Sequence, residues 1–116
     1  MTTTITRTDL IQVLEKAAAI IGRNGLCKRY LYDTRQAATG MPLADCRVDV
    51  IGALNTAAHG TPRYGGSPIV AAAEELLRQH VDAASVVAWN DRPGRDKDDA
   101  VVLLATAAAQ LRAEES

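Results

Sequence analysis

The chain has 116 residues, which predicts a single domain (residues 1–116) that buries roughly two-thirds of its unfolded surface. Its apolar fraction is 47% and rich in alanine, with no phenylalanine and one tryptophan, so we expect closely packed helices with few large anchors. The net charge of −1 gives no reason to expect nucleic acid or a membrane surface as a partner. No stretch approaches the roughly 20 apolar residues that span a bilayer, which also argues against a membrane partner.

The first predicted helix follows a tail, residues 1–5, that we expect to fray. Thr6 and Asp9 have the spacing of a capping box. Apolar residues then recur at helical spacing until residues 22–25, where Asn24 and Gly25 favour a left-handed cap. The predicted apolar stripe consists of Leu10, Val13, Leu14, Ala17, Ile20 and Ile21.

The next segment has aromatic and branched residues that predict a small extended arm near residues 27–33. Two interpretations of this arm remain. Lys28 and Arg29 beside Tyr30 and Tyr32 are compatible with single-stranded nucleic-acid binding, through stacking and phosphate contacts. The simpler interpretation is a loop that packs its tyrosines on the bundle and leaves its cations in water. Residues 34–40 are predicted to be a mobile connection.

A second, central helix is predicted to begin at Pro42, which suits a first turn, and to be buried on nearly every face. Its apolar residues include Cys46, Val48, Val50, Ile51, Ala53, Leu54, Ala57 and Ala58. Gly52 disfavours a helix interior, which predicts close approach of another helix at that point. Asp49 is the exception in this run, and we expect it to point outward or to pair with Arg47 or another cation.

Residues 59–66 are rich in turn-forming residues and are the predicted mobile surface loop. Ser67 and Pro68 then favour the start of a third helix, which we expect to end at His80. Its predicted apolar face consists of Ile69, Ala72, Ala73, Leu76 and Leu77.

A short fourth element, residues 82–90, is predicted as a helix capped by Asp82 and anchored by Trp89. Pro93 and Gly94 end it in a turn, and Asp96 with Asp99 form a second capping box before a last helix from about residue 97 to 113. The predicted stripe of that helix is Val101, Leu104, Ala105, Ala108 and Leu111. Arg92 and Arg95 are expected to pair with nearby carboxylates. The fold class is therefore an all-α bundle of four main helices and one short helix.

The run Val-Val-Ala-Trp-Asn-Asp-Arg-Pro-Gly-Arg, followed by an acidic helix start, resembles the C-terminal signature of a family of short uncharacterised proteins from actinobacteria and their phages. The Gly25-Leu26-Cys27 end of the first helix and the central Gly52-Ala53-Leu54 also match that family's plan, although the family more often has Trp where this chain has Leu26. The resemblance covers nearly the whole chain. It implies a fold plan and a source, without an activity.

No strong catalytic or metal-binding motif is present. The two cysteines and two histidines are scattered singly, so no metal site and no cofactor are predicted. Cys27 and Cys46, in a chain without a recognisable signal peptide, indicate reduced thiols and a cytoplasmic protein. The acidic residues around the last helix start are explained by capping.

These features favour a non-enzymatic protein-interaction module. If the gene is phage-borne, as the resemblance implies, its partner is a protein of the host. The predicted partner-binding residues are Arg63, Tyr64, Asn90, Asp91, Arg92 and Arg95, and the predicted structural anchors are Trp89, Gly52, Pro93 and Gly94. One alternative is a small ligand-binding domain or enzyme that uses Asp49, His59 and Cys46 around an inter-helix pocket. A DNA-binding accessory protein is the third reading, although no helix carries a basic stripe.

Overall fold

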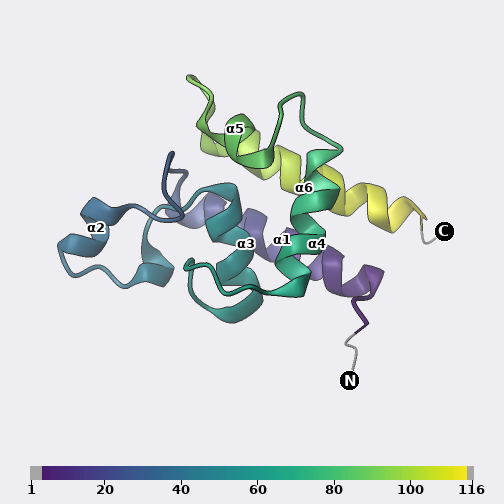
Figure 1. The fold of residues 1–116 in the computed structure, drawn as a ribbon, viewed down its shortest axis with the longest axis horizontal. Helices are drawn as coiled ribbons and strands as arrows, with labels where there is room; N and C mark the ends of the chain where they lie inside the picture. The colour runs from purple at the N-terminus through teal and green to yellow at the C-terminus, as the bar shows by residue number, and fades with distance from the viewer. Residues whose placement is uncertain (1–3, 115–116) are drawn as a thin grey trace.

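A computed structural model describes residues 4–114, in which helices pack around one apolar core (Figure 1). In chain order they are α1 (Arg7–Asn24), α2 (Thr34–Ala38), the 3-10 helix η1 (Leu43–Asp45), α3 (Val50–His59), α4 (Pro68–Arg78), α5 (Val86–Asp91) and α6 (Lys97–Glu114). The described residues contain no strand, and the predicted all-α bundle is confirmed. No helix within residues 4–114 has the length and apolar character needed to cross a membrane. Most of the predicted tail, residues 1–3, lies outside the described residues.

The core forms chiefly where α1 packs along α6 and against α3. The predicted stripe of α1 is confirmed, because every member except the half-buried Leu10 is buried. On α6 the predicted stripe is shifted: Ala105 is exposed, whereas Leu103 and Ala107 are buried. Both faces of this alanine-rich helix are apolar enough to pack, so periodicity alone did not fix the face that meets α1.

The central helix is buried as expected, but it begins at Val50 and not at Pro42. Asp49 is its N-cap, and the Asp49 carboxylate accepts a hydrogen bond from the Gly52 N–H. Pro42 instead precedes η1. Val48 stays outside the helix because its backbone bridges to Leu26 and Tyr32 in an extended conformation.

The arm, residues 27–33, is therefore an irregular segment whose two ends are tied to the strand-like residue Val48. The Cys27 N–H donates to the Val48 carbonyl at 3.0 Å, and the Asp33 N–H donates to the Arg47 carbonyl at 2.8 Å. Residues 34–40, predicted as a mobile connection, include the short helix α2. Asp33 caps that helix by accepting hydrogen bonds from the N–H groups of Arg35 and Gln36.

Helix α5 begins after Ser85, whose hydroxyl accepts the Ala88 N–H, so the predicted cap at Asp82 is wrong. Helix α4 ends at Arg78, two residues before the predicted His80. Trp89 is 7% exposed and belongs to the core, as its predicted anchoring role requires. The capping box of Asp96 and Asp99 at the start of α6 is present in both directions.

Candidate functional site

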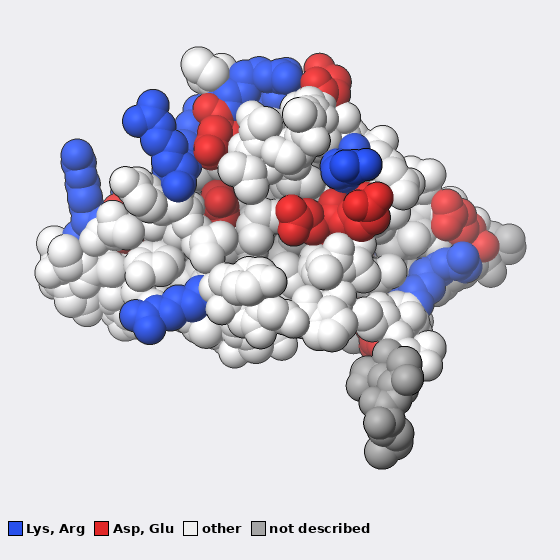
Figure 2. All heavy atoms as spheres, in the orientation of Figure 1, with Lys and Arg blue, Asp and Glu red and all other residues white. Residues whose placement is uncertain are grey.

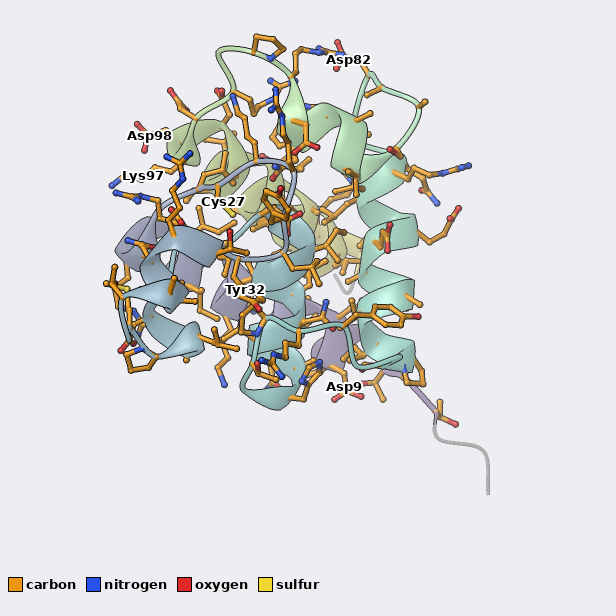
Figure 3. The ribbon with its side chains drawn as sticks, turned by 60° about the vertical axis from the view of Figure 1, so that its left-hand side comes forward. Asp9, Cys27, Tyr32, Asp82, Lys97 and Asp98 are labelled. Atoms are coloured by element: carbon orange, nitrogen blue, oxygen red, sulfur yellow. The ribbon has the colours of Figure 1, made fainter. Side chains whose placement is uncertain are left out.

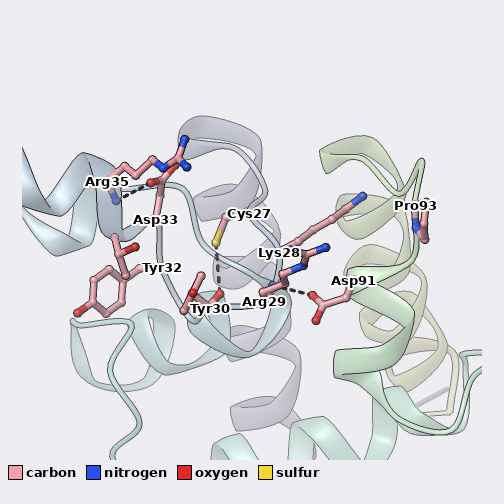
Figure 4. A pocket seen from close by; sticks show the side chains of 10 residues that line it. Cys27, Lys28, Arg29, Tyr30, Tyr32, Asp33, Arg35, Asp91 and Pro93 are labelled. Carbon is pink, nitrogen blue, oxygen red and sulfur yellow. Dashed lines mark hydrogen bonds between the residues drawn. The ribbon is translucent and has the colours of Figure 1, made fainter.

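A surface pocket of about 540 Å³ opens between the arm and the turn that follows α5 (Figure 4). We call it the arm–turn pocket. Its lining residues are Cys27, Lys28, Arg29, Tyr30, Tyr32, Asp33, Thr34, Arg35, Asp91 and Pro93. Figure 2 shows Lys and Arg side chains gathered at the upper left of the molecule, over the arm and this turn, with acidic groups between them.

The two sides of the pocket are far apart in the sequence and are joined by Asn90. This side chain is 1% exposed. Its Oδ1 accepts the N–H of Val50 at 3.0 Å, and its Nδ2 donates to the Cys27 carbonyl at 3.0 Å and to Asp91 Oδ1 at 3.1 Å. One amide thus fixes α5 to both the start of α3 and the arm. Because the group is buried, losing these partners would leave unpaired polar groups.

The tip of the arm is held by the residues that follow Asn90. Arg29 has φ of 76°, a left-handed conformation that is uncommon outside glycine. Its N–H donates to Asp91 Oδ1 at 2.9 Å, and Lys28 Nζ donates to the Arg92 carbonyl at 2.9 Å. The turn therefore determines the shape of the arm, and Arg29 and Tyr30 are left facing solvent.

The base of the arm rests on Gly52. The Leu31 carbonyl lies so close to the Gly52 Cα that an added Cβ would overlap it. The same carbonyl accepts the Asp49 N–H at 3.3 Å. Gly52 is thus a point of close approach, as predicted, but the neighbour is the backbone of the arm and not another helix. A glycine inside α3 is explained by this contact.

Asp49 is 4% exposed, so the prediction of an outward or cation-paired carboxylate is wrong. Arg47 pairs with Asp33 instead, at 3.1 Å. Desolvation by burial is the main reason that the pKa of Asp49 rises to about 7, and the nearby carboxylates Asp91 and Glu74 add to the rise. The hydrogen bond from Gly52 N–H acts in the opposite direction.

Both cysteines are protonated thiols near neutral pH. Burial, followed by the negative charges of Asp49, Asp33 and Asp91, raises the pKa of Cys27 to about 12. Its Sγ donates to the Tyr30 carbonyl at 3.3 Å. Cys46 is fully buried, and burial also raises its pKa. Since the thiolate is the nucleophilic form, neither sulfur is set up for attack.

The residues of the alternative enzyme site are not brought together. Asp49 precedes the first residue of α3 and His59 is the last, so the ten-residue helix separates them by roughly 15 Å. His59 is exposed, and its Nε2 lies 3.0 Å from Asn55 Oδ1. Within residues 4–114, no group of three or more His, Cys, Asp or Glu side chains is placed to hold a metal ion.

Of the predicted partner-binding residues, only Asp91 lines the arm–turn pocket, together with the predicted anchor Pro93. Asn90 is buried in the contacts described above, and Arg92 pairs with Asp82 at 3.3 Å. Figure 3, in which the left-hand side of the molecule comes forward, shows Asp82 at the top and Cys27 and Tyr32 near the centre of the face. Gly94 has φ of 84°, in agreement with its predicted role in the turn.

Arg95 was expected to pair with a carboxylate, but it forms no ion pair with any residue that the structure describes. Its guanidinium lies 3.9 Å above the Trp89 ring, and its Nε donates to the Trp89 carbonyl at 3.0 Å. A second pocket, of about 380 Å³, lies beside this stack and is also lined by His80 and residues of α6. The stacked cation covers the tryptophan and stabilises the turn.

Arg63 and Tyr64 are exposed in the loop between α3 and α4. That loop lies at the lower edge of Figure 1, whereas the turn after α5 lies at the upper edge. The two predicted binding segments therefore do not form one surface in this view.

The predicted partner-binding residues did not include Lys28, Arg29 and Arg35, which the structure brings together at the pocket. The basic and aromatic run at residues 28–32 was the available signal, and a loop with packed tyrosines was the simpler of its two interpretations. Tyr32 does pack on the core, but Tyr30 is 60% exposed.

One comparison with known proteins gives a match. The model of a family of unknown function (DUF6197) matches residues 5–110. No curated protein and no solved structure matches the chain.

Proposed function

We propose that this chain, which belongs to the family of unknown function DUF6197, is a non-enzymatic protein-interaction module whose binding face is the arm–turn pocket. Within this proposal the gene is carried by an actinobacterial phage and the partner is a host protein, as the resemblance of the C-terminal signature implies. The contact residues are those exposed around the pocket, above all Arg29, Tyr30 and Arg35. Asn90 supports them from beneath.

The observation that carries the proposal is the way the arm is held. Three hydrogen bonds join Cys27, Lys28 and Arg29 to residues 90–92, more than 60 positions away. They hold the arm with Arg29 in a left-handed backbone conformation and leave the large side chain of Tyr30 exposed at its tip. Loops held by a rigid scaffold are common binding elements, and exposed tyrosines are enriched among residues that dominate interface energies.

The chemistry of the pocket favours contact over catalysis. Its thiol is protonated, and the buried carboxylate with the raised pKa, Asp49, does not line it. The ionised groups at its rim can form hydrogen bonds and ion pairs with a partner. A small-ligand enzyme would place the titratable group with the shifted pKa in the pocket itself.

The test is affinity capture from a lysate of the host cells, using the tagged full chain and two matched variants. Tyr30→Ala removes the exposed ring at the arm, and Tyr64→Ala removes the other strongly exposed ring, which is 77% exposed. We expect a partner that is retained by the wild type and by Tyr64→Ala, and depleted at least tenfold by Tyr30→Ala. A partner that depends on Tyr64 and not on Tyr30 would contradict the proposed face, and so would the absence of any partner in repeated captures.

A further inference from the structure

We infer that the arm–turn pocket recognises an acidic segment of a protein partner, with Arg29 and Arg35 binding its carboxylates. This inference rests on the proposed function and adds the chemistry of the partner. Five of the lining residues carry charged side chains. Lys28, Arg29 and Arg35 are cationic, and Asp33 and Asp91 are anionic. A simple count gives an excess of one positive charge, so the state of the two carboxylates decides what the pocket can bind.

Both carboxylates are already engaged by the protein. Asp33 Oδ1 accepts the N–H groups of Arg35 and Gln36, and its Oδ2 pairs with Arg47. The hydrogen bond from the Gln36 N–H is the first reason that the pKa of Asp33 is lowered. Asp91 Oδ1 accepts two hydrogen bonds, one from the Arg29 N–H and one from the Asn90 amide. Asp33 is therefore held by backbone N–H groups and by a cation outside the pocket, and one oxygen of Asp91 is occupied by two hydrogen bonds from neutral groups.

Unlike the two carboxylates, the guanidinium groups of the two pocket arginines are not engaged by other described residues. Within residues 4–114, the side chains of Arg29 and Arg35 form no hydrogen bond and no ion pair, and both residues are exposed. Lys28 Nζ is anchored on the Arg92 carbonyl and keeps further N–H donors. A guanidinium presents its donors in a planar fork that matches a carboxylate with two parallel hydrogen bonds. Two such forks and an anchored ammonium around one hollow complement an acidic chain.

The same features disfavour a nucleic acid. Single strands bind grooves with a continuous cationic track and several aromatic platforms. Here two carboxylates interrupt the track, and Tyr30 is the only strongly exposed ring of the pocket because Tyr32 packs on the core. The volume of about 540 Å³ lies within the range of about 300–1,000 Å³ that is usual for ligand pockets.

The experiment is a titration of the ¹⁵N-labelled full chain with three probes of equal length: hexaglutamate, hexaglutamine and single-stranded hexathymidylate. The readout is the set of amide shifts at residues 27–35 and 91–95. We expect saturable shifts there with hexaglutamate, weakened as salt rises, and at least tenfold weaker binding of hexaglutamine and hexathymidylate. Arg29→Asn combined with Arg35→Gln should weaken hexaglutamate binding at least tenfold. Arg63→Gln removes one exposed cation elsewhere and should leave it unchanged.

Equal binding of hexaglutamine would overturn the inference, as would tighter binding of hexathymidylate, which would reassign the pocket to nucleic acid. Absence of shifts with hexaglutamate would overturn it as well. Failure of this inference can be distinguished from failure of the proposed function. A partner that depends on Tyr30 but a pocket that ignores hexaglutamate would keep the binding face and reject the acidic chemistry. Hexaglutamate binding without any Tyr30-dependent partner would reject the proposed function alone.

Discussion

Two exposed loops of this protein carry the same dipeptide, Arg-Tyr, but they differ in the hydrogen bonds that hold them. Arg29 and Tyr30 lie on the arm, where hydrogen bonds from residues 90–92 fix the backbone and a pocket adjoins the side chains. Arg63 and Tyr64 lie in the loop between α3 and α4. Among the described residues, no hydrogen bond joins residues 61–66 to the rest of the chain, although Gly65 packs against the His59 ring.

The comparison teaches that exposure and composition do not by themselves mark a binding surface. The loop at residues 59–66 has more glycine and proline, and for that reason the sequence predicts it to be the mobile surface loop. The arm has the side chains for contact and also a scaffold that holds them in place, which lowers the entropy lost on binding. Substitutions that remove this scaffold should therefore weaken both stability and binding.

The support of the arm on α3 gives the largest expected effect. Gly52→Ala places a Cβ against the Leu31 carbonyl, a backbone atom that cannot move without shifting the arm. We expect the free energy of unfolding to fall by about 4 kcal/mol or more, with loss of hexaglutamate binding. Gly22→Ala is the control, since it is also a helical glycine and its nearest neighbour would be Val101 Cγ2 at 4.0 Å. That change should be neutral or stabilise by up to about 1 kcal/mol. Urea unfolding measures both, and equal effects would contradict the close contact.

The buried carboxyl beneath the arm makes stability depend on pH. The pKa of Asp49 is raised from 3.8 to about 7 on folding, so the native state binds more protons between these values and stability falls as pH rises through that window. Below about pH 4 the effect is absent, and above about pH 7 it is complete. Asn also caps helices, so Asp49→Asn should keep the hydrogen bond to Gly52 while removing the charge.

Relative to wild type, we therefore expect Asp49→Asn to gain about 3 to 4 kcal/mol of stability between pH 4 and pH 8. Urea unfolding at a series of pH values gives this difference. A difference that stays constant with pH would show that Asp49 has an ordinary pKa, and hence that it is not buried under the arm.

The amide that joins the arm to α5 comes next. Asn90→Ala leaves the Val50 N–H and the Cys27 carbonyl without these partners, which predicts a loss of about 2 to 3 kcal/mol in the free energy of unfolding. Val87→Ala, at an exposed position of the same helix, should change it by less than about 0.5 kcal/mol. If urea unfolding gave similar values for both variants, Asn90 would not be the link between the two sides of the pocket.

The smallest effect on stability should accompany weaker binding of hexaglutamate. Arg29→Asn removes the cation, but asparagine tolerates a left-handed backbone and keeps the N–H that Asp91 accepts. Stability should stay within about 0.5 kcal/mol of wild type by urea unfolding. Arg63→Asn is the matched change in the other Arg-Tyr loop and should alter neither stability nor hexaglutamate binding. A large loss of stability from Arg29→Asn would mean that the side chain has a structural role.

Local signals account for the parts of the fold that the sequence predicted well. The capping boxes at Thr6–Asp9 and Asp96–Asp99 each depend on two residues three apart, and both are present. The stripe of α1 has enough large aliphatic residues to define its buried face. In α6, where alanine fills several positions, the same reasoning chose Ala105 wrongly because small apolar residues are tolerated on either face.

The pocket could not be predicted in this way because its contacts connect distant residues. Asn90 bonds to Val50 and Cys27, which lie 40 and 63 positions away, and no spacing along the chain indicates such pairs. Asn90 therefore resembled an ordinary turn residue. Asp49 resembled an exposed carboxylate for a similar reason, since its burial depends on the arm crossing over the start of α3.

Site-specific cross-linking compares the two Arg-Tyr loops most directly. A photoreactive phenylalanine analogue replaces Tyr30 in one variant of the full chain, Tyr64 in a second, and the exposed α6 residue Ala109 in a third as background. After irradiation in host cells, we expect a discrete adduct with a partner protein from position 30, and none from positions 64 and 109. An adduct from position 64 without one from position 30 would show that the supported arm is not the binding face.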